Sequence, residues 1–98
     1  MLHRLADRVA LVTGSSSGIG RAIALAFAAH DARLIVCADL TPAARPEVPA
    51  EARVPTHELI CQEHGKGSAI FVKTDVRISS HMEACVGEAV ARAGRLDV

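Results

Sequence analysis

The feature that most constrains the fold is a glycine-rich turn that separates two apolar segments of different periodicity. Residues 8–13 form a short apolar run that stops at Gly14, which predicts a strand buried on both faces. After the turn, apolar residues recur with the spacing of one helical face and predict an amphipathic helix to about His30: Ile19, Ala22, Ile23, Ala26 and Phe27. A buried strand that leads through such a turn into a helix is typical of α/β proteins.

The middle of the chain predicts a second strand and helix, joined by a long loop. Residues 33–38 predict another buried strand, closed by Asp39. Residues 40–55 contain all four prolines, which lack the N–H that a ladder or a helix interior needs, so we expect an extended surface loop. Thr56 is the predicted N-cap of a short helix over residues 57–64, which Gly65 is predicted to end in the αL conformation.

The last third predicts a third strand and helix and the start of a further strand. Residues 69–74 predict the strand, and Ser80 with Glu83 is a predicted capping box for a helix that ends at Gly94. The apolar stripe of that helix, expected in the core, is Met82, Cys85, Val86, Ala89, Val90 and Ala93. Residues 96–98 resemble the beginning of a fourth strand.

The order βαβαβαβ predicts a parallel, doubly wound α/β sheet, because right-handed crossovers place helices on both faces. We expect the strand order 3-2-1-4. The 98 residues are fewer than the ~150 of a usual domain, so we expect one partial domain over residues 1–98.

The turn itself has the composition of an anion-binding site. Gly14 is expected to allow a turn that a Cβ would obstruct, Gly18 to let an anion approach the backbone, and Gly20 to let the helix pack closely on the sheet. Free N–H groups at the helix start would then face a pyrophosphate, with three serines adding hydroxyl donors. Arg21 stands where a Walker motif needs lysine, which disfavours a nucleoside-triphosphate hydrolase.

This pattern resembles the short-chain dehydrogenase/reductase family, whose TGxxxGxG turn is matched by Thr13, Gly14, Gly18 and Gly20. The resemblance implies a Rossmann-type fold and a hydride-transferring oxidoreductase, with the cofactor held by Thr13, Gly14, Ser15, Ser16, Ser17, Gly18, Ile19 and Gly20.

The resemblance also implies roles for residues at the ends of the next two strands. Asp39 matches the acid that holds the adenosine ribose hydroxyls, and Asp75, followed by Val76, matches the acid beside the adenine ring. A carboxylate at Asp39 repels a 2′-phosphate, so the expected cofactor is NAD rather than NADP.

The family's catalytic groups have no match in these residues. Its serine and its Tyr-x-x-x-Lys pair would lie beyond Val98, and the chain contains no tyrosine at all. We therefore expect no catalytic residue here, and interpret the chain as the cofactor-binding half of such an oxidoreductase, inactive in this truncated form. The alternatives are a non-catalytic nucleotide-binding or interaction module and a nonfunctional truncated product. Relatives are expected to be homo-oligomers whose pairing segments lie downstream.

Composition excludes several other classes of function. A formal net charge of zero gives no electrostatic case for a nucleic-acid or membrane partner, and no apolar run reaches the ~18 residues of a membrane span. Three equally spaced cysteines disfavour a disulfide framework, so we expect the cysteines to be small core residues. The expected compartment is reducing and cytoplasmic. His57, Cys61 and His64 share one helical face, but without a CxxC or HExxH pattern we expect no metal site.

Overall fold

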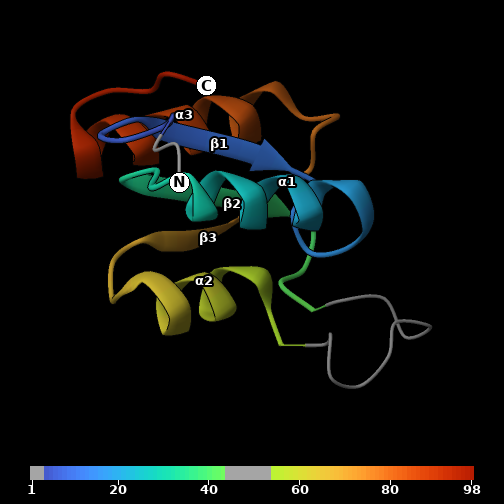
Figure 1. Ribbon diagram of the computed structural model, residues 1–98. Coiled ribbons are helices and arrows are strands. Elements are labelled where there is room, and N and C mark those ends of the chain that lie inside the picture. Colours follow the sequence, from blue (N-terminus) through green and yellow to red (C-terminus); the bar gives the residue numbers. More distant parts are fainter. Residues whose placement is uncertain (1–3, 44–53) are drawn as a thin grey trace.

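The structure is a computed structural model that describes residues 4–43 and 54–98. It contains a parallel sheet with helices on both faces (Figure 1). The strands and helices lie within one or two residues of the predicted bounds: β1 Val9–Thr13, α1 Gly18–Ala29, β2 Leu34–Asp39, α2 Thr56–His64, β3 Ala69–Lys73 and α3 Ser79–Ala93.

β2 is the central strand of the sheet, whose order among the described strands is β1-β2-β3. Both pairings are parallel, with Leu11 opposite Val36 and Cys37 opposite Phe71. The first five residues of β2 are all buried, as predicted for a strand covered on both faces. The helices α1 and α2 cover one face and α3 covers the other, so the predicted doubly wound, Rossmann-type arrangement is confirmed.

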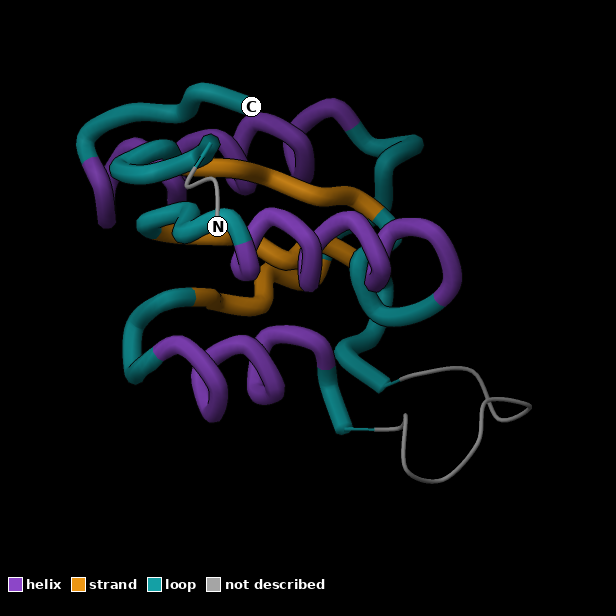
Figure 2. The backbone as a smooth tube through the Cα atoms, viewed as in Figure 1, coloured by secondary structure: helices purple, strands orange, loops and turns teal. Residues whose placement is uncertain are grey.

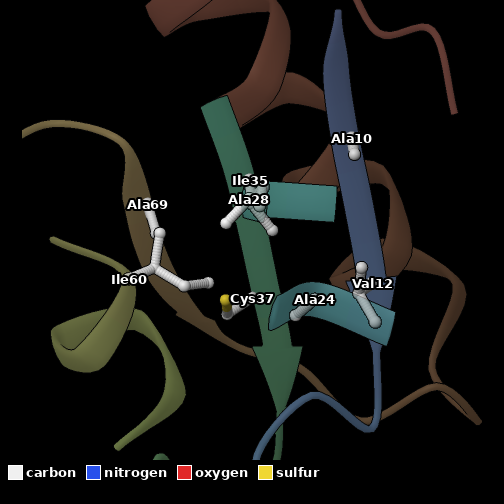
Figure 3. Close-up of a cluster of buried hydrophobic side chains, with 8 residues drawn as sticks. All are labelled: Ala10, Val12, Ala24, Ala28, Ile35, Cys37, Ile60 and Ala69. Atoms are coloured by element: carbon white, nitrogen blue, oxygen red, sulfur yellow. The ribbon is translucent and has the colours of Figure 1, made fainter. Parts of the chain in front are cut away.

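Each face of the sheet carries its own core. Figure 3 shows the larger one, in which side chains of β1, β2 and β3 meet those of α1 and α2: Ala10, Val12, Ala24, Ala28, Ile35, Cys37, Ile60 and Ala69. The opposite face joins Val9, Leu34 and Val36 to Ala89 of α3. Alternate residues of each strand thus serve opposite cores, which is the period of two expected for a strand.

The predicted fourth strand is not formed as an element, and Figure 2 draws residues 96–98 as a loop. This segment nevertheless bonds to β1: the Asp97 N–H donates to the Val9 carbonyl at 2.8 Å, and the Leu11 N–H donates to the Val98 carbonyl at 2.9 Å. Along β1, the main-chain groups of alternate residues point toward β2, and those of Val9 and Leu11 point away from it. The bonds to residues 97 and 98 therefore lie on the edge of β1 opposite β2. The position of a fourth strand in the order 3-2-1-4 stays a prediction.

The predicted buried stripe of α1 is wrong except at Phe27, which is partly buried and packs against the core. The residues that α1 buries are Ala24 and Ala28, whereas Ile19 is 81% exposed and Ile23 is 39% exposed. Small side chains face the sheet because they allow the helix to approach it closely. The stripe of α3 is correct in its centre, since Cys85 and Ala89 are buried, but Val86 and Val90 lie outward and are exposed.

The predicted N-caps are also wrong, because no side chain of the described residues caps α2 or α3. Thr56 is the first helical residue of α2 rather than its cap, and α3 begins at Ser79 without the predicted capping box. Gly65 has a positive φ of 110° but a ψ of 154°, which is not αL. Gly94 ends α3 as predicted, and it does so in the αL conformation, with φ 79° and ψ −2°.

The predicted surface loop over residues 40–55 is described only at its two ends, since residues 44–53 lie outside the described residues. Both described ends lie at the carboxyl edge of the sheet, where β2 ends and α2 begins (Figure 1). None of the helices in the described part of the chain is both long enough and apolar enough to cross a membrane.

Candidate functional site

The glycine turn connects β1 to α1 at the carboxyl edge of the sheet (Figure 1). Gly14 has φ 64° and Gly18 has φ 59°, a left-handed backbone that residues with a Cβ rarely adopt. Around a Cβ built on either glycine, the described residues leave open space to 4 Å. The left-handed backbone of Gly14 agrees with the predicted turn that a Cβ would obstruct, because in this conformation a Cβ crowds the carbonyl oxygen of its own residue. The open space beside Gly18 agrees with the approach of an anion.

Gly20 is required by a close contact. A Cβ at this position would lie 2.0 Å from the Gly14 carbonyl oxygen and 2.6 Å from its carbon. The sequence predicted that this glycine lets the helix pack closely on the sheet. The structure shows a close approach both to the turn at Gly14 and to the end of β1, where the Thr13 carbonyl oxygen lies 3.0 Å from such a Cβ. This contact joins the first turn of α1 to the backbone of Gly14.

The start of α1 is suited to a negatively charged group. Among the described residues, no side chain caps this helix at Ser17, and its first turn contains no acid. The first N–H groups of a helix lack intrahelical partners and carry a partial positive charge. With the positive φ of Gly18 beside them, these N–H groups can bind phosphate oxygens.

Two of the three turn serines are turned into the protein. Ser15 is fully buried and its hydroxyl donates to the Ala38 carbonyl at 3.5 Å, while the Ser16 hydroxyl donates to the Thr41 carbonyl. Their hydroxyls thus connect the turn to the end of β2 instead of facing an anion as expected. Ser17, the N-cap residue, is half-buried.

The structure brings Asp39 and the turn together. One carboxylate oxygen of Asp39 accepts the Ser16 N–H at 3.0 Å, and the other accepts the Leu40 N–H at 2.8 Å. Asp39 thereby lies at the end of β2, beside the turn between β1 and α1. The N–H groups at the start of α1 and the Asp39 carboxylate therefore lie near one another, and their roles in binding a diphosphate and a sugar stay predictions.

Asp75 and Val76 lie at the same edge, because the Thr74 N–H donates to the Asp39 carbonyl at 2.8 Å. The Asp75 carboxylate accepts hydrogen bonds from the Arg77 side chain at 3.0 and 2.8 Å and from the Arg77 N–H at 3.0 Å. These bonds lower the pKa of Asp75 to about 2, so the group is ionised at neutral pH. Val76 is 59% exposed.

Two further residues hold the turn, and the sequence analysis missed their role. The Thr56 hydroxyl donates to the Ser15 carbonyl at 2.6 Å and accepts a bond from the Arg21 guanidinium at 3.0 Å. Arg21 also donates to the Val54 carbonyl at 2.7 Å. The partners of Thr56 lie 35 and 41 residues away, so no local pattern could have indicated these contacts.

Other features of the described residues lie away from this site. A hollow of about 450 Å³ opens at the amino-terminal edge of the sheet, lined by Arg33, Leu34, Gly67, Ile70, Arg92 and Ala93. The described part of the chain has no group of three or more His, Cys, Asp or Glu residues able to hold a metal ion. The Cys61 thiol donates to the Ala69 carbonyl at 3.3 Å, and the ring of His57 lies 5.7 Å from that of Phe71.

Comparison with known proteins decides the family. The family model described as short chain dehydrogenase matches residues 8–98. The chain belongs to this family. It is 35% identical over 96 residues to momilactone A synthase of Oryza sativa subsp. japonica, a match that covers 98% of the chain and 30% of that protein. It is also 35% identical over 98 residues to trans-4-hydroxycyclohexanecarboxylate dehydrogenase of Sinomonas cyclohexanicum, covering 97% of the chain and 35% of that protein.

Solved structures of the short chain dehydrogenase family share the fold. The hydroxysteroid dehydrogenase from Escherichia coli superposes with a TM-score of 0.77 at 26% identity, over 97% of this chain and 35% of that one. A family member from Burkholderia phymatum, solved in complex with NAD, gives a TM-score of 0.75 at 26% identity, over 98% of this chain and 30% of that one. The chain thus spans about a third of the length of these relatives.

Proposed function

We propose that this chain holds the adenosine diphosphate half of NAD for an oxidoreductase that transfers hydride between the nicotinamide and an alcohol or carbonyl substrate. The observation that carries the proposal is the 3.0 Å hydrogen bond that the Ser16 N–H donates to the Asp39 carboxylate. It places the acid proposed to bind the ribose beside the glycine turn. The NAD complex of the Burkholderia phymatum relative supports the choice of cofactor.

Each part of the site would have a distinct task. The first N–H groups of α1, at Gly18, Ile19 and Gly20, would bind the pyrophosphate, where no acid of the first turn opposes it. The Asp39 carboxylate would accept hydrogen bonds from the ribose hydroxyls and repel the phosphate of NADP. When bound, the nicotinamide ring would supply the hydride chemistry.

The end of β3 would complete the adenine side of the site. Asp75 is ionised and fixed by Arg77, and Val76 offers an exposed apolar side chain next to it. We also propose that the 98 residues alone do not turn over substrate. Carbonyl reduction needs a proton donor at the reacting oxygen, and the chain has no tyrosine to fill the role that the family gives to that side chain.

The test is calorimetric titration of the chain with NAD, NADP and AMP. The wild type should bind NAD and AMP more tightly than NADP. Asp39→Ala should weaken NAD binding about tenfold or more, because hydrogen bonds to a charged group are worth about 1.5–3 kcal/mol, and should bring the two dinucleotides closer in affinity.

The matched control is Glu88→Ala, which removes an exposed acid of α3 on the opposite face of the sheet. It should leave all three affinities unchanged. Absence of NAD binding to the folded wild type would overturn the proposed function, and an unchanged ratio of NAD to NADP affinity in Asp39→Ala would overturn the role of Asp39.

A further inference from the structure

One peptide group of the turn is held at both of its ends by side chains from other elements. The Ser15 carbonyl accepts the Thr56 hydroxyl at 2.6 Å, and the Ser16 N–H on the same peptide donates to Asp39 at 3.0 Å. Because a peptide group is planar and rigid, these two bonds together fix its rotation. The hydroxyl of Thr56 and the carboxylate of Asp39 are therefore coupled through a single rigid unit.

Thr56 makes this contact from the first position of α2 and does not cap the helix. It is 2% exposed, and none of the described side chains caps the helix that it begins. Its hydroxyl donates to Ser15 instead and is held in place by Arg21, which also binds the Val54 carbonyl. The segment of residues 54–56 is thus fastened to the turn.

We propose that Thr56 is a positioning residue for ribose recognition, which acts by orienting the Asp39 carboxylate through the Ser15–Ser16 peptide. This inference rests on the proposed function. Without the Thr56 hydroxyl, the carbonyl of the fully buried Ser15 loses its short hydrogen bond, and the peptide is free to rotate. That rotation removes the Ser16 N–H from Asp39, whose carboxylate then keeps the Leu40 N–H at one oxygen and turns away from the sugar.

The consequence differs between the two dinucleotides. NAD would lose hydrogen bonds between its ribose hydroxyls and Asp39, whereas the 2′-phosphate of NADP has no such bond to this acid to lose. Damage to the turn as a whole would weaken the binding of NAD and of NADP equally, since each would place its pyrophosphate at the turn. The ratio of NADP to NAD dissociation constants therefore separates an effect on Asp39 from a general structural effect.

The experiment measures both dissociation constants by calorimetry for Thr56→Val, which keeps the shape but removes the hydroxyl, and for Thr56→Ser, which keeps the hydroxyl. Thr56→Val should weaken NAD binding up to about tenfold, as expected for one lost hydrogen bond, and lower the NADP to NAD ratio by the same factor. Thr56→Ser should restore the ratio. If Thr56→Val shows no folding transition, Thr56→Cys takes its place, because a thiol is a weaker donor.

The matched control is Thr74→Val. Thr74 is also 2% exposed, and valine keeps the main-chain N–H that this residue donates to the Asp39 carbonyl. Its hydroxyl bonds to the Val72 carbonyl and to Cys85, and not to the turn. It should lower stability against urea while leaving the NADP to NAD ratio unchanged. An equal fall of the ratio in Thr74→Val and Thr56→Val would show that the effect is merely structural and would overturn the inference.

A double variant tests the route through Asp39. In an Asp39→Ala background, Thr56→Val should change the ratio no further, because the group that it positions is gone. A full additional change there, or an unchanged ratio in Thr56→Val alone, contradicts the inference. Failure of the folded wild type to bind NAD contradicts the proposed function instead, so the two failures are distinguishable.

Discussion

A pair of glycine-to-alanine substitutions in two helices should change stability in opposite directions. Gly20 is the third residue of α1 and Gly87 lies inside α3. Alanine is favoured over glycine in a helix by about 1 kcal/mol, so propensity alone predicts that both variants are stabilised. Around a Cβ at Gly87 the described residues leave open space to 4 Å, and Gly87→Ala should therefore gain that stability.

Gly20→Ala meets the backbone of the turn instead. Its Cβ would lie 2.0 Å from the Gly14 oxygen and would need to move about 1 Å to reach the shortest separation that real Cβ atoms show. Overpacking of this kind costs about 3 kcal/mol where backbone has to move. After the gain in propensity, a net loss of about 2 kcal/mol remains, which lowers Tm by about 8–16 °C in a domain of this size.

Thermal unfolding followed by circular dichroism measures both variants under one set of conditions. Gly87→Ala should raise Tm by about 4–8 °C, and Gly20→Ala should lower it. If Gly20→Ala melts at or above the temperature of the wild type, the turn yields to the new methyl group, and the close contact of Gly20 with Gly14 does not constrain the fold.

Two further predictions concern ionisable groups. Arg95 and the Val9 N–H lower the pKa of Asp97 to about 2, so its ionised form adds stability above pH 3.8 that is lost as the pH falls toward 2. The stability gap between wild type and Asp97→Asn in urea should vanish across that range, and a gap that persists at pH 2 contradicts the assignment. Burial raises the pKa of Cys37 to about 12, so iodoacetamide should label the partly exposed Cys61 first. Equal labelling rates in the native chain, read by peptide mass spectrometry, would contradict it.

The positions of the elements could be predicted because their signals are local. The buried strand predicted over residues 33–38 and closed by Asp39 is found within one residue in β2. Gly94 ends α3 as predicted, since glycine adopts the positive φ at the end of a helix more easily than any residue with a Cβ. Such signals depend on neighbouring residues and on backbone geometry, which the sequence displays directly.

The face that α1 turns to the sheet could not be predicted in the same way. The hydrophobic pattern places Ile19 and Ile23 in the core, yet the helix buries Ala24 and Ala28. The contact between Gly20 and the Gly14 carbonyl holds the start of the helix close to the turn, and the residues that the helix then buries fully against the sheet are the small Ala24 and Ala28. Hydrophobicity ranks residues by their transfer from water, not by the space between two elements, so the larger side chains were assigned to the wrong face.

The residues of the candidate site likewise include some that the sequence could predict and some that it could not. The glycines and Asp39 belong to a motif whose spacing is visible in the sequence, and the structure brings them together. Thr56 belongs to no motif, and its local sequence predicted a helix cap. The acceptor that its hydroxyl binds, the Ser15 carbonyl, is 41 residues distant and therefore invisible to a local pattern. A buried acceptor without a hydrogen bond costs free energy, and which acceptors are buried beside a given hydroxyl depends on the tertiary structure. Residues that tune recognition from outside a motif, as Thr56 is proposed to do through Asp39, therefore have to be sought among the buried partners of the motif's own backbone.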